Sequence, residues 1–272
     1  MEKTKQDKQL PEGQQSHLIR LLTATFDLLV RGNEIPAWRS AFVELAGLEN
    51  DLFHNHDNRQ QLKAVEAEAL VAAGNADEFG VQTAPNNGQQ TTGKFFFRYP
   101  LIQYRSIKGK AAIFAMNEGV AAFQKVLATN SWEIEWEGQP LMLQLQSLDM
   151  KDHYLQMTKE MMAYQLNRWL PFNDENYQRW LDCPDLRARV DLLEKILSGQ
   201  LLNFCTGAGW QLPERFDLRL LHLHATCLMR YHDTPRVALN VTYCTNMLLP
   251  QGIALGKAVS HGFGCQFPVR TS

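Results

Sequence analysis

Hydrophobic residues alternate with polar ones along the first patterned stretch of the chain. One face of an extended segment over residues 18–28 collects Leu18, Leu22, Ala24, Phe26 and Leu28. A period of two predicts a half-buried strand. After Gly32-Asn33 the period lengthens, and the apolar positions become Trp38, Phe42 and Leu45. That spacing predicts a helix that begins near Pro36 and ends at Gly47.

The next elements follow the same logic. Residues 95–107 are rich in aromatic and β-branched side chains, Lys108-Gly109-Lys110 turns the chain, and residues 111–116 return it. This pattern predicts a β-hairpin. A second helix opens at Glu118 and packs through Val120, Phe123 and Leu127. Residues 132–148 read as extended, although Gly138 and Pro140 interrupt them.

The second half of the chain repeats the theme. We expect a helix over about residues 187–202 and strands over residues 216–229 and 236–245, while the aromatic-rich residues 164–180 are ordered structure. The order strand, helix, hairpin, helix, strand is the ferredoxin-like plan that RNA-recognition motifs also use. The sequence therefore predicts an α+β protein of two tandem ferredoxin-like (RRM-like) domains with antiparallel sheets.

We expect four segments along the chain. Residues 1–16 form a disordered lead, residues 17–152 the N-terminal domain, and residues 153–272 the C-terminal domain with a glycine-rich loop. Residues 57–93 are polar and rich in Ala, Gln, Asn and Gly, which predicts an insertion within the first domain.

Composition narrows the class of protein. The five cysteines are scattered, odd in number and never spaced C-x-x-C, which argues against a disulfide framework and a four-cysteine zinc site. The N-terminus lacks the apolar core of a secretory signal, and no stretch is apolar enough to span a membrane. We expect a cytoplasmic protein with no membrane partner.

The net charge is −2, from 27 basic and 29 acidic residues, which is unusual for a nucleic-acid binder. Local charge differs from the total. Residues 94–110 contain no acidic residue and five basic ones: Lys94, Arg98, Arg105, Lys108 and Lys110. Residues 251–272 add Lys257 and Arg270, again without a carboxylate. If the two segments meet, they make a positive face for RNA; the alternative is two solvated strand edges.

His54 and His56 lie two positions apart, so both rings point to one side of an extended backbone. Because the pKa of histidine is about 6.5, one ring can be neutral and the other charged near neutral pH. Such a pair suits acid-base cleavage of RNA without a metal. Histidines spaced H-x-H are also common zinc ligands, and a second pair, His222 and His224, leaves a four-imidazole site open. The structural alternative for the second pair is two histidines on a half-exposed strand.

The C-terminal segment G-I-A-L-G-K-A-V-S-H-G-F-G covers residues 252–264. Glycines allow positive φ and expose backbone N–H groups, so such a loop can wrap a phosphate, with Lys257 adding charge. It is not a nucleotide P-loop, because three residues separate Gly252 from Gly256 and Ala258 follows the lysine. An anonymous loop of this kind is more often structural.

This segment resembles the glycine-rich signature of the repeat-associated mysterious protein superfamily, and in particular its CRISPR repeat endoribonucleases. Three further segments agree with the resemblance: L-F-H-N-H at residues 52–56, R-Y-P-L-I-Q-Y with K-G-K-A-A-I at residues 98–104 and 108–113, and L-N-R-W-L-P-F-N at residues 166–173. They run in order across most of the chain.

The resemblance implies an enzyme that cleaves the repeat of a precursor CRISPR RNA and leaves a 2',3'-cyclic phosphate and a 5'-hydroxyl. It implies His54 and His56 as the acid-base pair, with Tyr104 and Lys108 orienting or neutralising the scissile phosphate. The RNA-facing loop would contain Gly256, Lys257, Gly262 and Gly264, and we add Arg98, Arg105 and Lys110 as RNA-binding residues from the basic segment. No metal or other cofactor is expected.

The expected partner is CRISPR repeat RNA, with an effector ribonucleoprotein complex and a homodimer left open. Two departures from the family support a second hypothesis. The insertion follows the histidines directly, and the acidic balance predicts weaker RNA affinity. The alternative is a catalytically inactive RNA-binding paralogue that acts in a ribonucleoprotein or nucleic-acid repair assembly.

Overall fold

The computed structural model describes residues 16–47, 51–54, 99–128, 131–231 and 234–269. Its helices are α1 (Ile35–Ala46), α2 (Asp51–His54), α4 (Glu118–Leu127), α5 (Asp174–Leu181), α6 (Leu186–Gly207) and the 3₁₀ turn η2 (Val259–His261). Its strands are β1 (His17–Leu29), β2 (Ile102–Ile107), β3 (Lys110–Met116), β4 (Glu133–Trp136), β5 (Gln139–Met142), β6 (Leu145–Trp169), β7 (Leu218–Tyr231), β8 (Thr234–Leu248) and β9 (Cys265–Pro268). Each helix and strand predicted over described residues has a counterpart.

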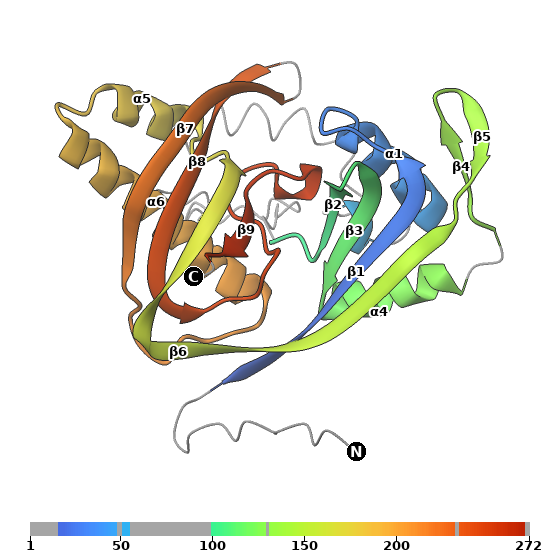
Figure 1. Cartoon of the computed structure of the whole chain (residues 1–272), viewed down its shortest axis with the longest axis horizontal. Helices are drawn as coiled ribbons and strands as arrows, with labels where there is room; N and C mark the ends of the chain where they lie inside the picture. Colours follow the sequence, from blue (N-terminus) through green and yellow to red (C-terminus); the bar gives the residue numbers. More distant parts are fainter. Residues whose placement is uncertain (1–15, 48–50, 55–98, 129–130, 232–233, 270–272) are drawn as a thin grey trace, which may run out of the picture.

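One antiparallel sheet joins the two halves of the molecule (Figure 1). Its strands lie in the order β2-β3-β1-β6-β8-β7, and β9 pairs with β6. The 25-residue strand β6 belongs to both halves, because residues 145–155 pair with β1 and the strand pairs with β8 from Gln156 onward. The prediction of an α+β fold with antiparallel sheets is confirmed. Two separate ferredoxin-like sheets are not resolved, since β6 is shared.

The core of the first half lies between the sheet and the helices α1 and α4. The alternating residues Leu22, Ala24 and Phe26 of β1 are buried on this face. Trp38 of α1 packs with its ring centroid 5.3 Å from that of Phe26, and its indole N–H donates to the Ala112 carbonyl of β3 at 3.1 Å. The apolar period of two in the strand and the longer period in the helix therefore meet in one aromatic core.

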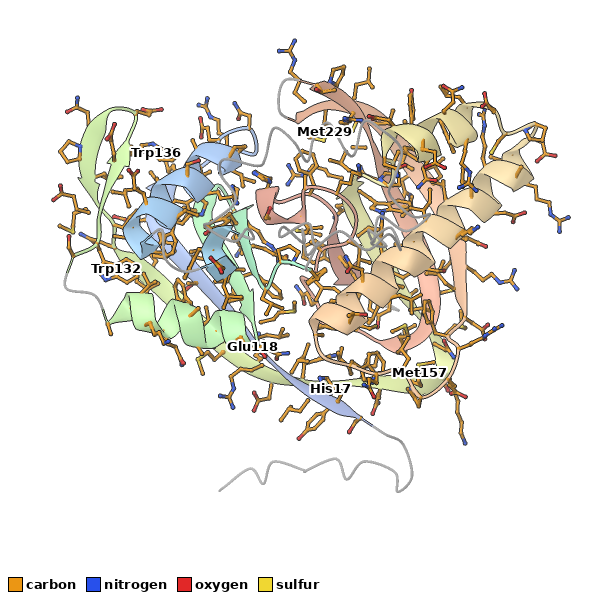
Figure 2. The ribbon with its side chains drawn as sticks, turned by 180° about the vertical axis from the view of Figure 1, so that it is seen from behind. His17, Glu118, Trp132, Trp136, Met157 and Met229 are labelled. Atoms are coloured by element: carbon orange, nitrogen blue, oxygen red, sulfur yellow. The ribbon has the colours of Figure 1, made fainter. Side chains whose placement is uncertain are left out.

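In the second half, α6 covers the sheet. The Asp185 side chain caps this helix by accepting the Ala188 N–H at 2.8 Å. Its apolar stripe, which includes Leu193, Leu197 and Phe204, packs in the core that also contains residues of β6 and β8. A ring nitrogen of His17, at the start of β1, lies 2.9 Å from the Ala208 carbonyl at the end of α6, which ties the halves together (Figure 2).

Two stretches differ in detail from expectation. Within residues 132–148, residues 133–142 form a small β4–β5 hairpin, turned at Gly138 with φ 76°, and β6 begins at Leu145. Residues 164–180 contain the end of β6 and the helix α5, which Asn173 caps by accepting the Asn176 N–H at 2.7 Å. The predicted insertion lies outside the described residues. No helix in the described ranges is long and apolar enough to cross a membrane.

Candidate nucleic-acid interface

The glycine-rich segment, residues 252–264, lies where the two halves meet. Its 3₁₀ turn η2 contacts β2 and α1 of the first half. In the second half, Ala254 pairs with Cys265 of β9, and backbone hydrogen bonds join the segment to the residues at the end of β6 (Figure 1). At Gly262, an added Cβ would come within 2.7 Å of Ile35 Cδ1 and 3.4 Å of the Tyr104 carbonyl oxygen. The second basic stretch, residues 251–272, therefore contacts the first, residues 94–110, within the described parts of both.

Two glycines of this segment are sterically required. Gly264 has φ 67°, and a Cβ there would lie 1.8 Å from the Leu255 carbonyl oxygen. Gly256 has φ 103°, and its Cβ would lie 2.8 Å from both Trp169 Cδ1 and the Leu170 carbonyl oxygen. Both positions combine a left-handed backbone with close approach of another chain segment, which only glycine tolerates.

Several N–H groups of the segment donate to carbonyls of neighbouring parts of the chain. Gly252 donates to the Gln266 carbonyl at 2.8 Å, Lys257 to the Leu170 carbonyl at 2.9 Å, and Gly264 to the Arg168 carbonyl at 3.1 Å. These bonds hold the loop in a fixed conformation. The loop contributes a rigid shape at the junction of the halves, and the phosphate-binding role of Gly256, Gly262 and Gly264 stays a prediction.

Arg168, near the end of β6, supports the glycine-rich segment. It adopts φ 50°, which is rare for a residue with a side chain, and its N–H donates to Asn240 Oδ1 at 2.7 Å. Its guanidinium donates to the Gly262 carbonyl at 2.9 Å and lies 5.7 Å from the Phe263 ring centre. Backbone and side chain of one residue thus both fix the loop.

Tyr99 anchors the other end of the segment. Its hydroxyl donates to the Ala254 carbonyl at 2.8 Å and accepts the Ala254 N–H at 3.3 Å and the Gln103 amide at 3.0 Å. Burial raises the pKa of Tyr99 to about 12, although these hydrogen bonds and the charge of Arg105 oppose the rise. The phenol therefore stays neutral and able to donate throughout the physiological range.

Replacing Tyr99 with phenylalanine is expected to destabilise the protein by about 2 kcal/mol, because buried partners of the hydroxyl lose their hydrogen bonds. Tyr154→Phe is the matched control, since Tyr154 is exposed, and we expect a change within about 0.5 kcal/mol. Urea unfolding followed by circular dichroism measures both. Equal effects in the two variants would show that the Tyr99 network does not stabilise the fold.

The predicted RNA-binding residue Arg105 faces inward. It is 6% exposed, donates to Gln103 Oε1, and lies 4.2 Å from the Phe114 ring centre. Its guanidinium also borders Gly252, where an added Cβ would be 3.2 Å from Nη1. Arg105 therefore supports the start of the glycine-rich segment from the face of β2 that the second half covers.

Lys257 stands on the exposed side of the loop near α5 and β8. Desolvation by surrounding chain atoms lowers the pKa of its ammonium, Arg236 lowers it further, and Asp174 opposes the shift. Arg236 and Asp174 form an ion pair with each other. Cationic side chains from two different segments thus gather here beside one carboxylate.

The predicted catalytic loop begins at α2. Phe53 of this helix is buried, with its ring centroid 5.9 Å from that of Phe42 in α1. The Tyr104 hydroxyl donates to the Phe53 carbonyl at 3.4 Å from within the same aromatic core. Burial raises the pKa of Tyr104. His54 is the last residue of α2; its side chain, and all of His56, lie outside the described residues.

The remaining predicted residues lie around the β2–β3 turn or outside the described ranges. Lys108 is exposed in the turn with φ 52°, and Lys110 at the start of β3 donates to Gln146 Oε1. Arg98 lies outside the described residues. The structure thus brings Tyr104 close to α2 and to the glycine-rich segment, whereas Lys108 and Lys110 lie at the far end of the β2–β3 hairpin.

His222 and His224 lie on the edge strand β7. Their ring centroids are 5.7 Å apart, and a ring nitrogen of His224 is 2.7 Å from Thr242 Oγ1. Over the described ranges, no group of three or more His, Cys, Asp or Glu side chains is arranged to hold a metal ion. The four-imidazole hypothesis also needs His56, which those ranges do not include.

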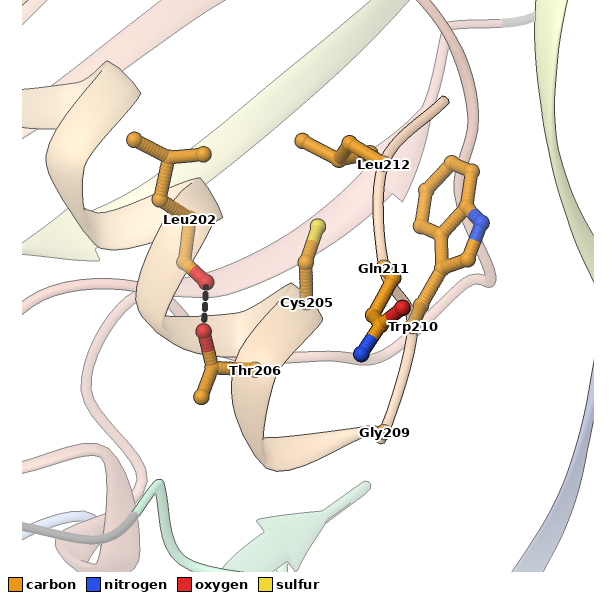
Figure 3. A pocket seen from close by; sticks show the side chains of 7 residues that line it. All are labelled: Leu202, Cys205, Thr206, Gly209, Trp210, Gln211 and Leu212. Atoms are coloured by element: carbon orange, nitrogen blue, oxygen red, sulfur yellow. Dashed lines mark hydrogen bonds between the residues drawn. The ribbon is translucent and has the colours of Figure 1, made fainter. Parts of the chain in front are cut away.

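A pocket of 340 Å³ opens at the end of α6 and involves none of the predicted site residues (Figure 3). It is lined by Leu202, Cys205, Thr206, Gly209, Trp210, Gln211 and Leu212. The Thr206 hydroxyl donates to the Leu202 carbonyl at 3.0 Å, and burial raises the pKa of the Cys205 thiol to about 12. The pocket therefore offers no activated nucleophile.

Sequence reasoning missed Tyr99 and Arg168 as supports of the loop. Both lie inside segments that carry the family resemblance, yet their partners, Ala254 and Gly262, are 155 and 94 positions away in the chain. Long-range contacts of this kind leave no local periodicity. The positive φ of Arg168 has no sequence signal either, since arginine rarely adopts it.

Comparisons with known proteins agree with this geometry. A model of the Cas6b C-terminal domain matches residues 156–267, and a model of the Cas6b N-terminal domain matches residues 76–154. A solved structure described as Cas6b superposes with a TM-score of 0.70 at 16% identity, over 93% of this chain and 100% of that chain. A second, described as the CRISPR RNA processing endoribonuclease Cas6b, gives 0.61 at 15% identity over the same shares.

The search of curated proteins found no match. The two structural likenesses, at identities this low, show the fold alone. The two domain models together span well over half of the chain, in the order expected for one protein. The chain therefore belongs to the Cas6b family.

Proposed function

We propose that this protein cleaves CRISPR repeat RNA without a metal ion and that His54 and His56 are its acid-base pair. One imidazole takes the proton of the 2'-hydroxyl, whose oxygen attacks the adjacent phosphorus, and the other protonates the departing 5'-oxygen. The products are a 2',3'-cyclic phosphate and a 5'-hydroxyl. The solved relative described as a CRISPR RNA processing endoribonuclease supports the choice of substrate.

The anchoring of α2 carries this proposal. The helix is four residues long and could not persist alone. Phe53 fixes it to the aromatic core, and the Tyr104 hydroxyl holds its last turn. The backbone of His54 belongs to a helix bound to Tyr104, and the Tyr104 carbonyl oxygen lies 3.4 Å from where a Cβ of Gly262 would be, which supports the proposal. A fixed origin for a catalytic side chain favours catalysis because proton transfer depends on geometry.

The supporting residues take two kinds of role in this proposal. Tyr104 and Arg105 act as positioning residues, because both are buried. Lys257 and Lys108 are exposed and neutralise phosphates along the RNA, as do Arg98 and Lys110 in the same basic stretch. Gly256, Gly262 and Gly264 shape the loop surface against which the RNA lies.

The finer architecture belongs to the same proposal. We infer two ferredoxin-like units, residues 17–152 and 153–272, that share β6 and carry an insertion over residues 57–93. The expected partner beyond RNA is an effector ribonucleoprotein that keeps the processed product.

Incubation of the purified full chain with candidate repeat RNA in excess EDTA tests the proposal. We expect one cut per repeat, with 3' ends that resist ligation until the cyclic phosphate is opened and the resulting phosphate is removed. Cleavage that disappears in EDTA and returns with a divalent cation would contradict the metal-independent mechanism. Tight RNA retention without any product would instead support the inactive paralogue.

A further inference from the structure

The first part of β6 is an edge of the sheet. Over the described residues, Leu145–Leu155 pairs on one side with β1, and β8 joins β6 only from Gln156 (Figure 1). Alternate N–H and C=O groups on the other side of this segment therefore point out of the sheet. Unpaired strand edges of this length readily accept another strand.

Residues 145–152 of this edge are exposed and partly apolar. Leu148 and Met150 share one face, where they are 44% and 46% exposed. Asp149 and Lys151 share the other face, with Lys151 Nζ 2.6 Å from Asp149 Oδ2 and both side chains more than half exposed. One face thus offers apolar surface, and the other offers one charge of each sign.

The edge is complementary to itself in one register. When a strand pairs antiparallel with a second copy about a two-fold axis, the residue on the axis faces its own equivalent and its neighbours face each other's equivalents. An axis at Met150 places Asp149 opposite Lys151 twice. An axis at Asp149, Lys151 or Asp152 instead places like charges directly opposite each other, which is destabilising.

Met150 is also the midpoint of the free segment, five residues from Leu145 and five from Leu155. The register that pairs the charges is therefore the register that uses the whole free edge. The same pairing places Met150 opposite its own equivalent, whereas Leu148 lies opposite Asp152 of the second copy and diagonal to Met150. Backbone length and charge agree on a single arrangement.

We propose that the Leu145–Leu155 edge of β6 is a dimerisation surface that pairs antiparallel with the same edge of a second copy of this chain, with the two-fold axis at Met150. The result is one sheet that runs through both copies. No step of this inference depends on RNA cleavage, so its failure would leave the proposed function untouched.

Charge reversal tests the register. In Asp149→Lys the new ammonium faces Lys151 of the second copy, and in Lys151→Asp the new carboxylate faces Asp149 of the second copy. Each variant alone is expected to dimerise at least roughly tenfold more weakly than the parent, because two attractive cross-strand pairs become two repulsive ones. An equimolar mixture of the two variants restores attraction at both positions and is expected to dimerise like the parent.

Sedimentation velocity over a concentration series measures the dissociation constants, and thermal unfolding confirms that each variant is folded. The exposed pair within one strand contributes little to folding. In the mixture, no single chain carries opposite charges at positions 149 and 151. Restored dimerisation can therefore come only from contacts between two copies, and not from an effect inside one chain.

A cysteine at the axis provides a second readout. In Met150→Cys the two new thiols lie opposite each other, with Cα atoms roughly 4.5–5.5 Å apart, which permits a disulfide. Mild oxidation is expected to give a covalent dimer. Ser147→Cys, away from the axis, and the parent chain with its five native cysteines are the controls and should stay uncrosslinked.

A parent chain that stays monomeric at the highest soluble concentration would overturn the proposal. So would a dimer that is indifferent to the charge reversals and fails to crosslink through Met150→Cys, because its interface would lie elsewhere.

Discussion

Replacing Gly264 with alanine is expected to destabilise the protein by about 3 to 5 kcal/mol, the sum of a left-handed backbone and an enforced overlap. The backbone has φ 67°, and the new Cβ would start 1.8 Å from the Leu255 carbonyl oxygen. Relief requires the two arms of the glycine-rich segment to separate, which breaks the bond from the Leu255 N–H to the Gly264 carbonyl at 2.9 Å. Equilibrium unfolding in guanidinium chloride measures the loss.

Gly109→Ala is the matched control. Gly109 has φ 78°, but nothing lies within 4 Å of its Cβ position. Only the backbone strain applies there, so about 1 to 2 kcal/mol is expected. Equal losses in the two variants would show that close packing of the glycine-rich segment contributes nothing to the fold.

Replacing His54 or His56 with alanine is expected to slow cleavage of repeat RNA by about 10²- to 10⁴-fold, the usual contribution of a general acid or base. Each ring has its own proton to move, so each single variant should show the loss. RNA binding should persist in both, because the basic residues of the β2–β3 hairpin and Lys257 are unchanged. Single-turnover kinetics with excess enzyme separates the chemical step from binding.

His222→Ala is the control for these variants. His222 has the same H-x-H spacing with His224, yet it lies exposed on the edge strand β7. Its cleavage rate should match that of the parent. If both loop variants retain the parent rate while His222→Ala loses it, the catalytic site has been assigned to the wrong pair.

Strands and helices with a clear period were predictable from sequence because packing follows the period. Strand β1 and helix α1 each place their apolar stripe against the same core. The length of β6 was not predictable. Residues 145–152 are exposed on both faces, so their pattern shows no apolar alternation, and only pairing with β1 defines them as strand.

The start of helix α5 has a capping signal in the sequence that the prediction did not use. Asn173 precedes Asp174 and Glu175, and an Asx cap followed by acidic residues marks a helix start. The aromatic richness of this stretch predicted order but did not indicate its type.

The segments that form the candidate site were predictable from the sequence, but the burial of their side chains was not. Sequence alternation separates Tyr104 from Gln103 and Arg105 on β2, yet it cannot say what covers each face. The polar face of β2 is buried because the second half of the chain packs over it. Arg105, which was predicted to bind RNA at the surface, therefore supports the glycine-rich segment from inside the fold. Tyr104, which was predicted to lie at the scissile phosphate, donates a hydrogen bond to α2.

An RNA with a single 2'-deoxy nucleotide on the 5' side of the cleaved bond tests the central claim most directly. Attack by the 2'-hydroxyl requires that one oxygen, so we expect the substituted repeat to bind with the parent affinity and to remain uncut in EDTA. Cleavage of the substituted RNA at the same bond and at a comparable rate would contradict the mechanism, because a nucleophile other than the 2'-hydroxyl would then be at work.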